Sequence, residues 1–172
     1  LLDETGSFTA STLASRVAKT FDLMGGACAM DSDDASGLNA LVASMDQLRS
    51  GVVDLVVCGS GTRALNLSLF ELMDHQGRLV RSGNAADIPD DLSRVIPGEG
   101  AVVLLLCRRS TAEQAGLRIL GTIQPSTSRN TTTVTYDAVD VQVVRKLGYL
   151  AGAHSLVRLV AETIRATRIE YS

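Results

Sequence analysis

The hydrophobic pattern along the chain alternates between helical and strand-like spacing. Apolar residues recur every three or four positions in several segments, which predicts helices at residues 11–21, 35–50, 64–73 and 111–115. The second segment is the longest, and Gly51 directly after it is a typical helix C-cap. A further helix is expected within residues 141–167, where apolar positions are again periodic.

Short, uniformly apolar runs between these helices predict strands. They lie at residues 26–30, 52–58, 101–107 and 118–123. Strands that alternate with helices indicate an α/β fold with buried sheets. We interpret residues 59–61 (Gly-Ser-Gly) as a tight exit from the second strand. The polar residues 74–100, which include Pro89 and Pro97, are expected to form a long surface loop.

The composition is typical of a folded protein and gives no sign of a highly charged binding partner such as nucleic acid. Of 172 residues, 45% are hydrophobic and 3% aromatic, so small and branched aliphatic side chains must fill the core. The net charge of -3 gives no footprint for nucleic acid. No apolar run reaches the roughly 20 residues that span a bilayer. The first residues, Leu-Leu-Asp-Glu, lack the pattern of a signal peptide and are typical of an excised segment.

The residues that could bind metal or form disulfides have simpler interpretations. Cys28, Cys58 and Cys107 each lie in an apolar run, which favours buried free thiols of a cytoplasmic protein over a disulfide framework. The acidic cluster at residues 31–34 lacks the glycine and the closing glutamate of a calcium loop, so no metal is expected. His75 is predicted to be solvated, and His154 to be packed or partly exposed on the last helix.

A series of short motifs runs from residue 25 to residue 100. Two glycines at 25–26 precede a turn at residues 30–38 (Met-Asp-Ser-Asp-Asp-Ala-Ser-Gly-Leu). The motifs that follow are Leu-Arg-Ser-Gly at 48–51, Gly59, Gln-Gly-Arg at 76–78 and Gly-Glu-Gly at 98–100. This order resembles the ketosynthase (beta-ketoacyl synthase) domains of polyketide and fatty-acid synthases, over residues 12–107.

The resemblance assigns a specific residue to the position of the family's catalytic cysteine. The family has Asp-Thr-Ala-Cys-Ser-Ser-Ser-Leu at this turn. Counting forward from Gly25 and backward from Leu48 without a gap reaches Asp34 at the cysteine position. Cys28 lies six residues upstream, inside an expected strand. The resemblance therefore implies a degenerate member of the family, similar to chain-length-factor-type members that lack the cysteine.

Other positions of the family pattern also differ. No His-Gly-Thr-Gly-Thr stretch, which carries the first family histidine, occurs between residues 123 and 146. The second histidine, in an Asn-Ile-Gly-His type motif, corresponds to Tyr149 in Lys-Leu-Gly-Tyr. The loop that carries a gating Phe-Asp in the family has Gly83-Asn84 here. The Gly-Glu-Gly turn, which lies near the active-site floor in the family, is interpreted as structural.

The resemblance also implies the architecture. We expect a thiolase-like fold, layered αβαβα, in an incomplete or reduced form. Residues 1–124 would form the N-terminal ketosynthase-like portion with the vestigial nucleophile turn. Residues 125–135 resemble a linker, and residues 136–172 would be a remnant of the C-terminal half with a long helix. In the family the strand before the nucleophile lies at a dimer interface, and residues 26–30 would suit that contact.

The chemistry of condensation explains why Asp34 matters. A thiolate at a helix N-terminus attacks the carrier-bound thioester, and histidines assist decarboxylation of the malonyl unit. Asp34 at this position is expected to be an ionised N-cap. A carboxylate is a poor nucleophile toward a thioester, and its charge opposes an oxyanion and a malonyl carboxylate. A relic acid-base role for Asp34, and an acid role for Tyr149 in place of packing, are the alternatives.

The favoured hypothesis is a non-condensing, chain-length-factor-type domain or subunit in polyketide or polyunsaturated fatty acid biosynthesis. It would shape the acyl pocket, form a homodimer or a heterodimer with an active ketosynthase, and dock acyl carrier protein. No cofactor is expected, and the carrier's phosphopantetheine would only tether the substrate. Two alternatives stay open. One is an enzyme that uses Asp34 as acid or base on a carrier-bound acyl substrate, and the other is a structural spacer of a megasynthase.

Overall fold

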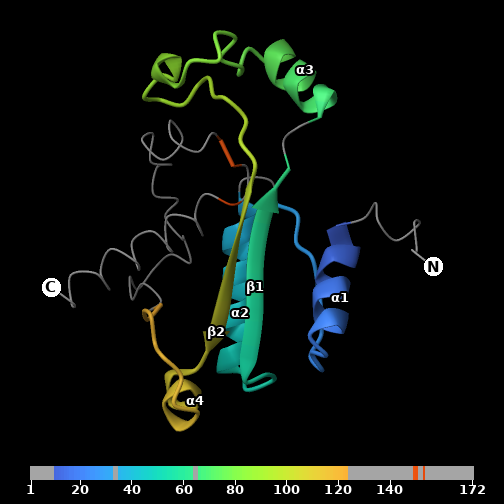
Figure 1. Cartoon of the computed structure of the whole chain (residues 1–172), viewed down its shortest axis with the longest axis vertical. Coiled ribbons are helices and arrows are strands. Elements are labelled where there is room, and N and C mark those ends of the chain that lie inside the picture. Colours follow the sequence, from blue (N-terminus) through green and yellow to red (C-terminus); the bar gives the residue numbers. More distant parts are fainter. Residues whose placement is uncertain (1–9, 33–34, 64–65, 124–148, 151–152, 154–172) are drawn as a thin grey trace, which may run out of the picture.

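Two antiparallel strands and one long helix form the centre of the molecule (Figure 1). The computed structural model describes residues 10–32, 35–63, 66–123, 149–150 and 153. Strand β1 (Leu55–Thr62) pairs with β2 (Gly100–Cys107), and helix α2 (Ser36–Arg49) covers one face of the pair. The other elements are α1 (Ala10–Thr20), α3 (Leu67–His75), the short 3-10 helix η3 (Ala85–Asp87) and α4 (Arg109–Gln114).

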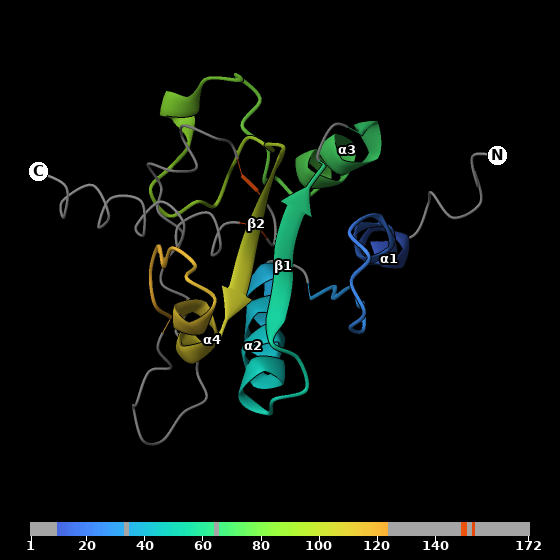
Figure 2. The same cartoon turned by 60° about the horizontal axis from the view of Figure 1, so that its bottom comes forward.

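The remaining helices lie at the two ends of the central sheet and to one side of it. Helix α3 and η3 lie at the end where β1 finishes and β2 begins, and α4 lies at the opposite end (Figure 1). Helix α1 stands to the side of β1 in both views, whereas α2 runs along the sheet (Figure 2). Four predicted helices are therefore confirmed, with shifts of one to three residues at their ends.

The sheet buries one face only. Val56 and Cys58 of β1, with Leu104 of β2, point toward α2 and pack on Leu41. The alternate positions point away from the helix, and Val103 and Leu105 there are 65% and 63% exposed. Because successive side chains of a strand face opposite sides, one apolar face meets α2 and the other stays open. The expectation of buried sheets therefore holds for one face only in the part of the chain that the structure describes.

Residues 74–100 contain a second hydrophobic core, so the prediction of a polar surface loop is wrong for them. Val80, Ile88 and Val95 pack with Met73 of α3, and Ile88 and Val95 are 1% and 0% exposed. The backbone supports this packing, since the Val80 N–H donates to the Val95 carbonyl at 3.1 Å and the Val95 N–H donates to the Arg78 carbonyl at 2.8 Å. Isolated apolar residues among polar neighbours gave no periodic signal, and tertiary packing buried them.

The turn after α3 shows why the chain reverses there. The Asn66 side chain accepts the Leu69 N–H at 2.7 Å and caps the start of the helix. At the other end Gly77 adopts a φ of 68°, and the Gly77 and Arg78 N–H groups donate to the carbonyls of Asp74 and Met73. This Schellman arrangement needs a left-handed residue, which glycine provides without steric cost. The Gln-Gly-Arg motif is thus a helix stop.

Three strand predictions need correction. Residues 26–30 and 118–123 are not strands, and residues 26–30 are exposed. Strand β1 begins three residues later than predicted and continues through Gly59 and Gly61, which are not a tight exit. The cause is close cross-strand packing: a Cβ at Gly61 would lie 3.3 Å from the Ala101 Cβ. Glycine in a strand often marks such a close approach.

The cysteines do not share one environment. Cys58 is buried as predicted, but Cys107 is half-buried and Cys28 is exposed, so the expectation of three buried thiols is wrong. Cys28 is exposed because the predicted strand around it does not form in this structure. All three are free thiols, as expected.

The described residues contain neither a membrane-spanning helix nor a metal-binding cluster. None of their helices combines the length and the hydrophobicity required to cross a bilayer. None of their histidine, cysteine and acidic side chains gather in groups of three that could hold a metal ion. His75 is exposed at the end of α3, as predicted, whereas His154 lies outside the described residues. The division at residues 125–135 also lies outside them and stays a prediction.

Candidate functional site

The turn before α2 is the first part of the candidate site. The Ser32 N–H donates to the Ser36 Oγ at 2.9 Å, and the Ala35 N–H donates to the Ser32 carbonyl at 3.0 Å. These bonds connect Ser32 to Ala35 and Ser36 at the start of the helix. The N-cap position falls on Ala35, one residue later than predicted for Asp34. Asp34 itself, and Asp33, lie outside the described residues, so the role of Asp34 stays a prediction.

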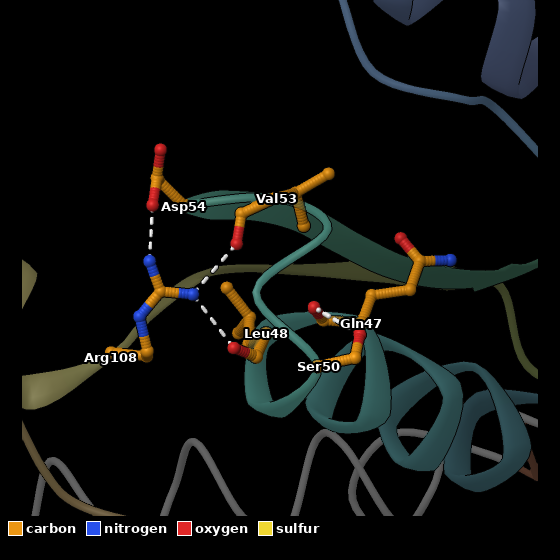
Figure 3. Close-up of polar contacts among 6 residues, drawn as sticks. All are labelled: Gln47, Leu48, Ser50, Val53, Asp54 and Arg108. Carbon is orange, nitrogen blue, oxygen red and sulfur yellow. Dashed lines mark hydrogen bonds and ion pairs between the residues drawn. The ribbon is translucent and has the colours of Figure 1, made fainter.

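Helix α2 is fixed at its other end by Arg108, which directly follows β2 (Figure 3). The Arg108 Nη1 donates to the carbonyls of Leu48 at 2.7 Å and Val53 at 2.9 Å, and its Nη2 pairs with Asp54. The last carbonyls of a helix lack intrahelical partners, and a cation there also favours the helix dipole. Arg108 therefore fixes the connection between α2 and β1, and so the helix that begins at the candidate turn.

Loss of this guanidinium should destabilise the fold. We expect Arg108→Ala to lower the free energy of unfolding by about 1.5–3 kcal/mol, because two carbonyls lose a charged donor. Arg108→Lys should recover part of this loss, since an ammonium reaches fewer acceptors at once. Asp54→Ala is the matched control and should cost under about 1 kcal/mol, because the Asp54 carboxylate is largely exposed. Urea unfolding of the three variants measures this. Equal losses for Arg108→Ala and Asp54→Ala would contradict the assignment.

Tyr149 lies beside the Gly-Glu-Gly turn. Its N–H donates to the Ile96 carbonyl at 2.7 Å, and its carbonyl accepts the Gly98 N–H at 3.0 Å. Its half-buried ring packs on the core of residues 73–95, with the Arg78 guanidinium 5.8 Å from the ring centre. The structure thus brings together three motifs that lie apart in the sequence: Gln-Gly-Arg through Arg78, Gly-Glu-Gly through Gly98, and the segment of Tyr149. Of the two predicted roles for Tyr149, these contacts favour packing, and the acid role stays a prediction.

Local hydrogen bonds hold Gly83 and Asn84, which the resemblance assigns to the gating loop of the family. Gly83 has a φ of 68°, and the Asn84 side chain accepts the Ala86 N–H at 3.0 Å. The Ser82 hydroxyl donates to Asp87 at 2.6 Å, and a bidentate pair of Arg81 with Asp74 lies just before it. Residues 82–87 therefore form a capped turn with small and polar side chains.

Cys58 does not offer a replacement nucleophile. It faces α2 from the middle of β1 and is buried beside Ser44, whose hydroxyl donates to the Ala40 carbonyl at 2.7 Å. Burial raises the pKa of the Cys58 thiol, and a hydrogen bond with Ser44 opposes only part of that shift. A thiol with a raised pKa is protonated near neutral pH and is a weak nucleophile. Cys58 is therefore a core residue.

The raised pKa of Cys58 predicts how stability depends on pH. The unfolded chain ionises this thiol near its ordinary pKa of 9.0, whereas the folded chain keeps it protonated to a higher pH. The contribution of the Cys58 thiol to the free energy of unfolding is therefore complete below pH 9. It is lost as the pH rises through the pKa of this thiol in the folded chain. We expect the free energy of unfolding to fall more steeply above pH 9 in the native protein than in Cys58→Ala. Parallel curves from pH 7 to 10.5 would contradict this.

Sequence reasoning missed two features of the site. Arg108 was not singled out, although a charged residue directly after a fully apolar strand could have signalled a capping role. The core around Ile88 and Val95 had no periodic signal in the sequence. It nevertheless positions Tyr149 and the Gly-Glu-Gly turn.

Comparison with known proteins identifies the family. Residues 3–112 match the N-terminal domain of beta-ketoacyl synthases. The 6-methylsalicylic acid synthase of Penicillium terrestre is 32% identical over 114 residues, which is 66% of this chain and 6% of that protein. The chain spans only 3–7% of the length of the curated relatives that it matches.

Solved structures agree with this match. A type II polyketide synthase ketosynthase in complex with its acyl-carrier protein (AntDE:AntF) has a TM-score of 0.62 at 25% identity, over 70% of this chain and 31% of that chain. The oxazolomycin ketosynthase domain of Streptomyces albus has a TM-score of 0.59 at 28% identity, over 65% and 20%. The structure is thus a partial α/β fragment of the thiolase-like ketosynthase fold, as predicted. The chain belongs to the beta-ketoacyl synthase family, as a ketosynthase-like domain of the polyketide synthase type.

Proposed function

We propose that this chain is a non-condensing ketosynthase-type domain or subunit of a polyketide assembly line. The observation that carries the proposal is Asp34, which the motif count from Gly25 and from Leu48 assigns to the position of the family's catalytic cysteine. A carboxylate neither attacks a thioester effectively nor leaves the site free for the developing oxyanion. The function that remains for such a domain is to shape an acyl pocket and to bind a sister ketosynthase.

The environment of the cysteines supports this proposal. Cys58 is buried with a raised pKa, and Cys107 is half-buried at the end of β2, away from the turn before α2. Cys28 is exposed six residues before Asp34, in a segment without regular structure. A catalytic cysteine needs a helix N-terminus or a nearby base to stabilise its thiolate. None of these three positions lies at the start of α2.

The proposal that this chain binds a partner rests on residues 21–32, which precede the turn before α2. Residues 21–32 are all exposed, and Met24 is 92% exposed. Residues 26–30 (Gly-Ala-Cys-Ala-Met) are uncharged and small, so their backbone can approach a second chain closely. We propose that this segment pairs with a sister ketosynthase or with a second copy. Acyl carrier protein is a further proposed partner, because one of the similar structures is a ketosynthase in complex with that protein.

Charges placed in this segment should disrupt the assembly. We expect the native protein to sediment as a dimer, alone or with the active ketosynthase of its own assembly line. Ala27→Lys with Ala29→Lys should shift it to monomer with either partner, because the contact would bury two ammonium groups that have no partner there. Gln114→Lys adds a charge on exposed α4 and should leave the dimer intact. A native protein that is monomeric in both conditions, and indifferent to carrier protein, would instead indicate a structural spacer.

A further inference from the structure

We draw no further inference here: the strongest candidate, the open apolar face of the β1–β2 sheet where Leu55, Val57, Val103 and Leu105 are exposed opposite to α2, carries no proposal because nothing in the structure shows what covers it.

Discussion

The native protein should form no detectable β-ketoacyl product from malonyl- and acyl-carrier protein. Removal of a catalytic nucleophile costs on the order of 10⁶ in kcat in a hydrolase where it has been measured. By the resemblance, the two family histidines are also expected to be absent here, with Tyr149 at the position of the second. A rate reduced by this factor lies below the detection limit of a product assay by chromatography.

The matched variant for this assay is Asp34→Asn, which keeps the size of the side chain and removes its charge. If Asp34 has no chemical role, native protein and variant should behave alike in every turnover assay, including loss of carbon dioxide from malonyl-carrier protein. Turnover by the native protein that Asp34→Asn abolishes would instead establish an acid-base role for Asp34. Circular dichroism of both proteins shows whether the fold survives the substitution.

The second large effect concerns the core of residues 73–95. We expect Ile88→Ala to lower the free energy of unfolding by about 2–5 kcal/mol, because Ile88 is 1% exposed and its loss leaves a cavity between Val80 and Val95. Leu72→Ala is the matched control. Leu72 lies one residue before Met73 of that core but is 53% exposed, so its loss should change stability by only about 0.5 kcal/mol.

Urea unfolding followed by circular dichroism measures both variants. If Ile88→Ala fails to fold, Ile88→Val should still fold and lose about 0.5–1.5 kcal/mol. Equal and small losses at Ile88 and Leu72 would mean that residues 74–100 are the surface loop that the sequence suggested. The effect should also reach Tyr149, since its ring packs on this cluster. The fluorescence of Tyr149 should therefore change in the same urea-unfolding transition.

The sequence predicted four helices to within three residues at their ends, but only two of the four predicted strands form. Helix α2 follows from its periodicity and strand β2 from its uniformly apolar run, and Gly51 ends α2 with a φ of 73°. The pairing of β1 with β2 could not be read from the sequence, because residues 63–99 separate them and contain no hairpin signal. Tertiary contact also determines where β1 ends. The strand continues through Gly59 and Gly61 because β2 pairs with it there.

The candidate site could be predicted only where a motif carries local geometry. The Gln-Gly-Arg motif encodes a helix stop, and the structure shows one at Gly77. The meeting of Tyr149 with Gly98 depends on long-range packing, and no local pattern signals it. The same holds for Arg108, whose acceptors Leu48 and Val53 lie more than fifty residues earlier in the chain.

The most direct test of the central claim is intact-mass spectrometry after incubation with acyl-carrier protein. The native protein should keep its unmodified mass, and Cys28→Ser provides the background for the exposed thiol. Asp34→Cys should gain the mass of one acyl group, because it restores a thiolate before α2. An acyl adduct on the native protein that persists in Cys28→Ser and maps to residues 31–36 would contradict the account.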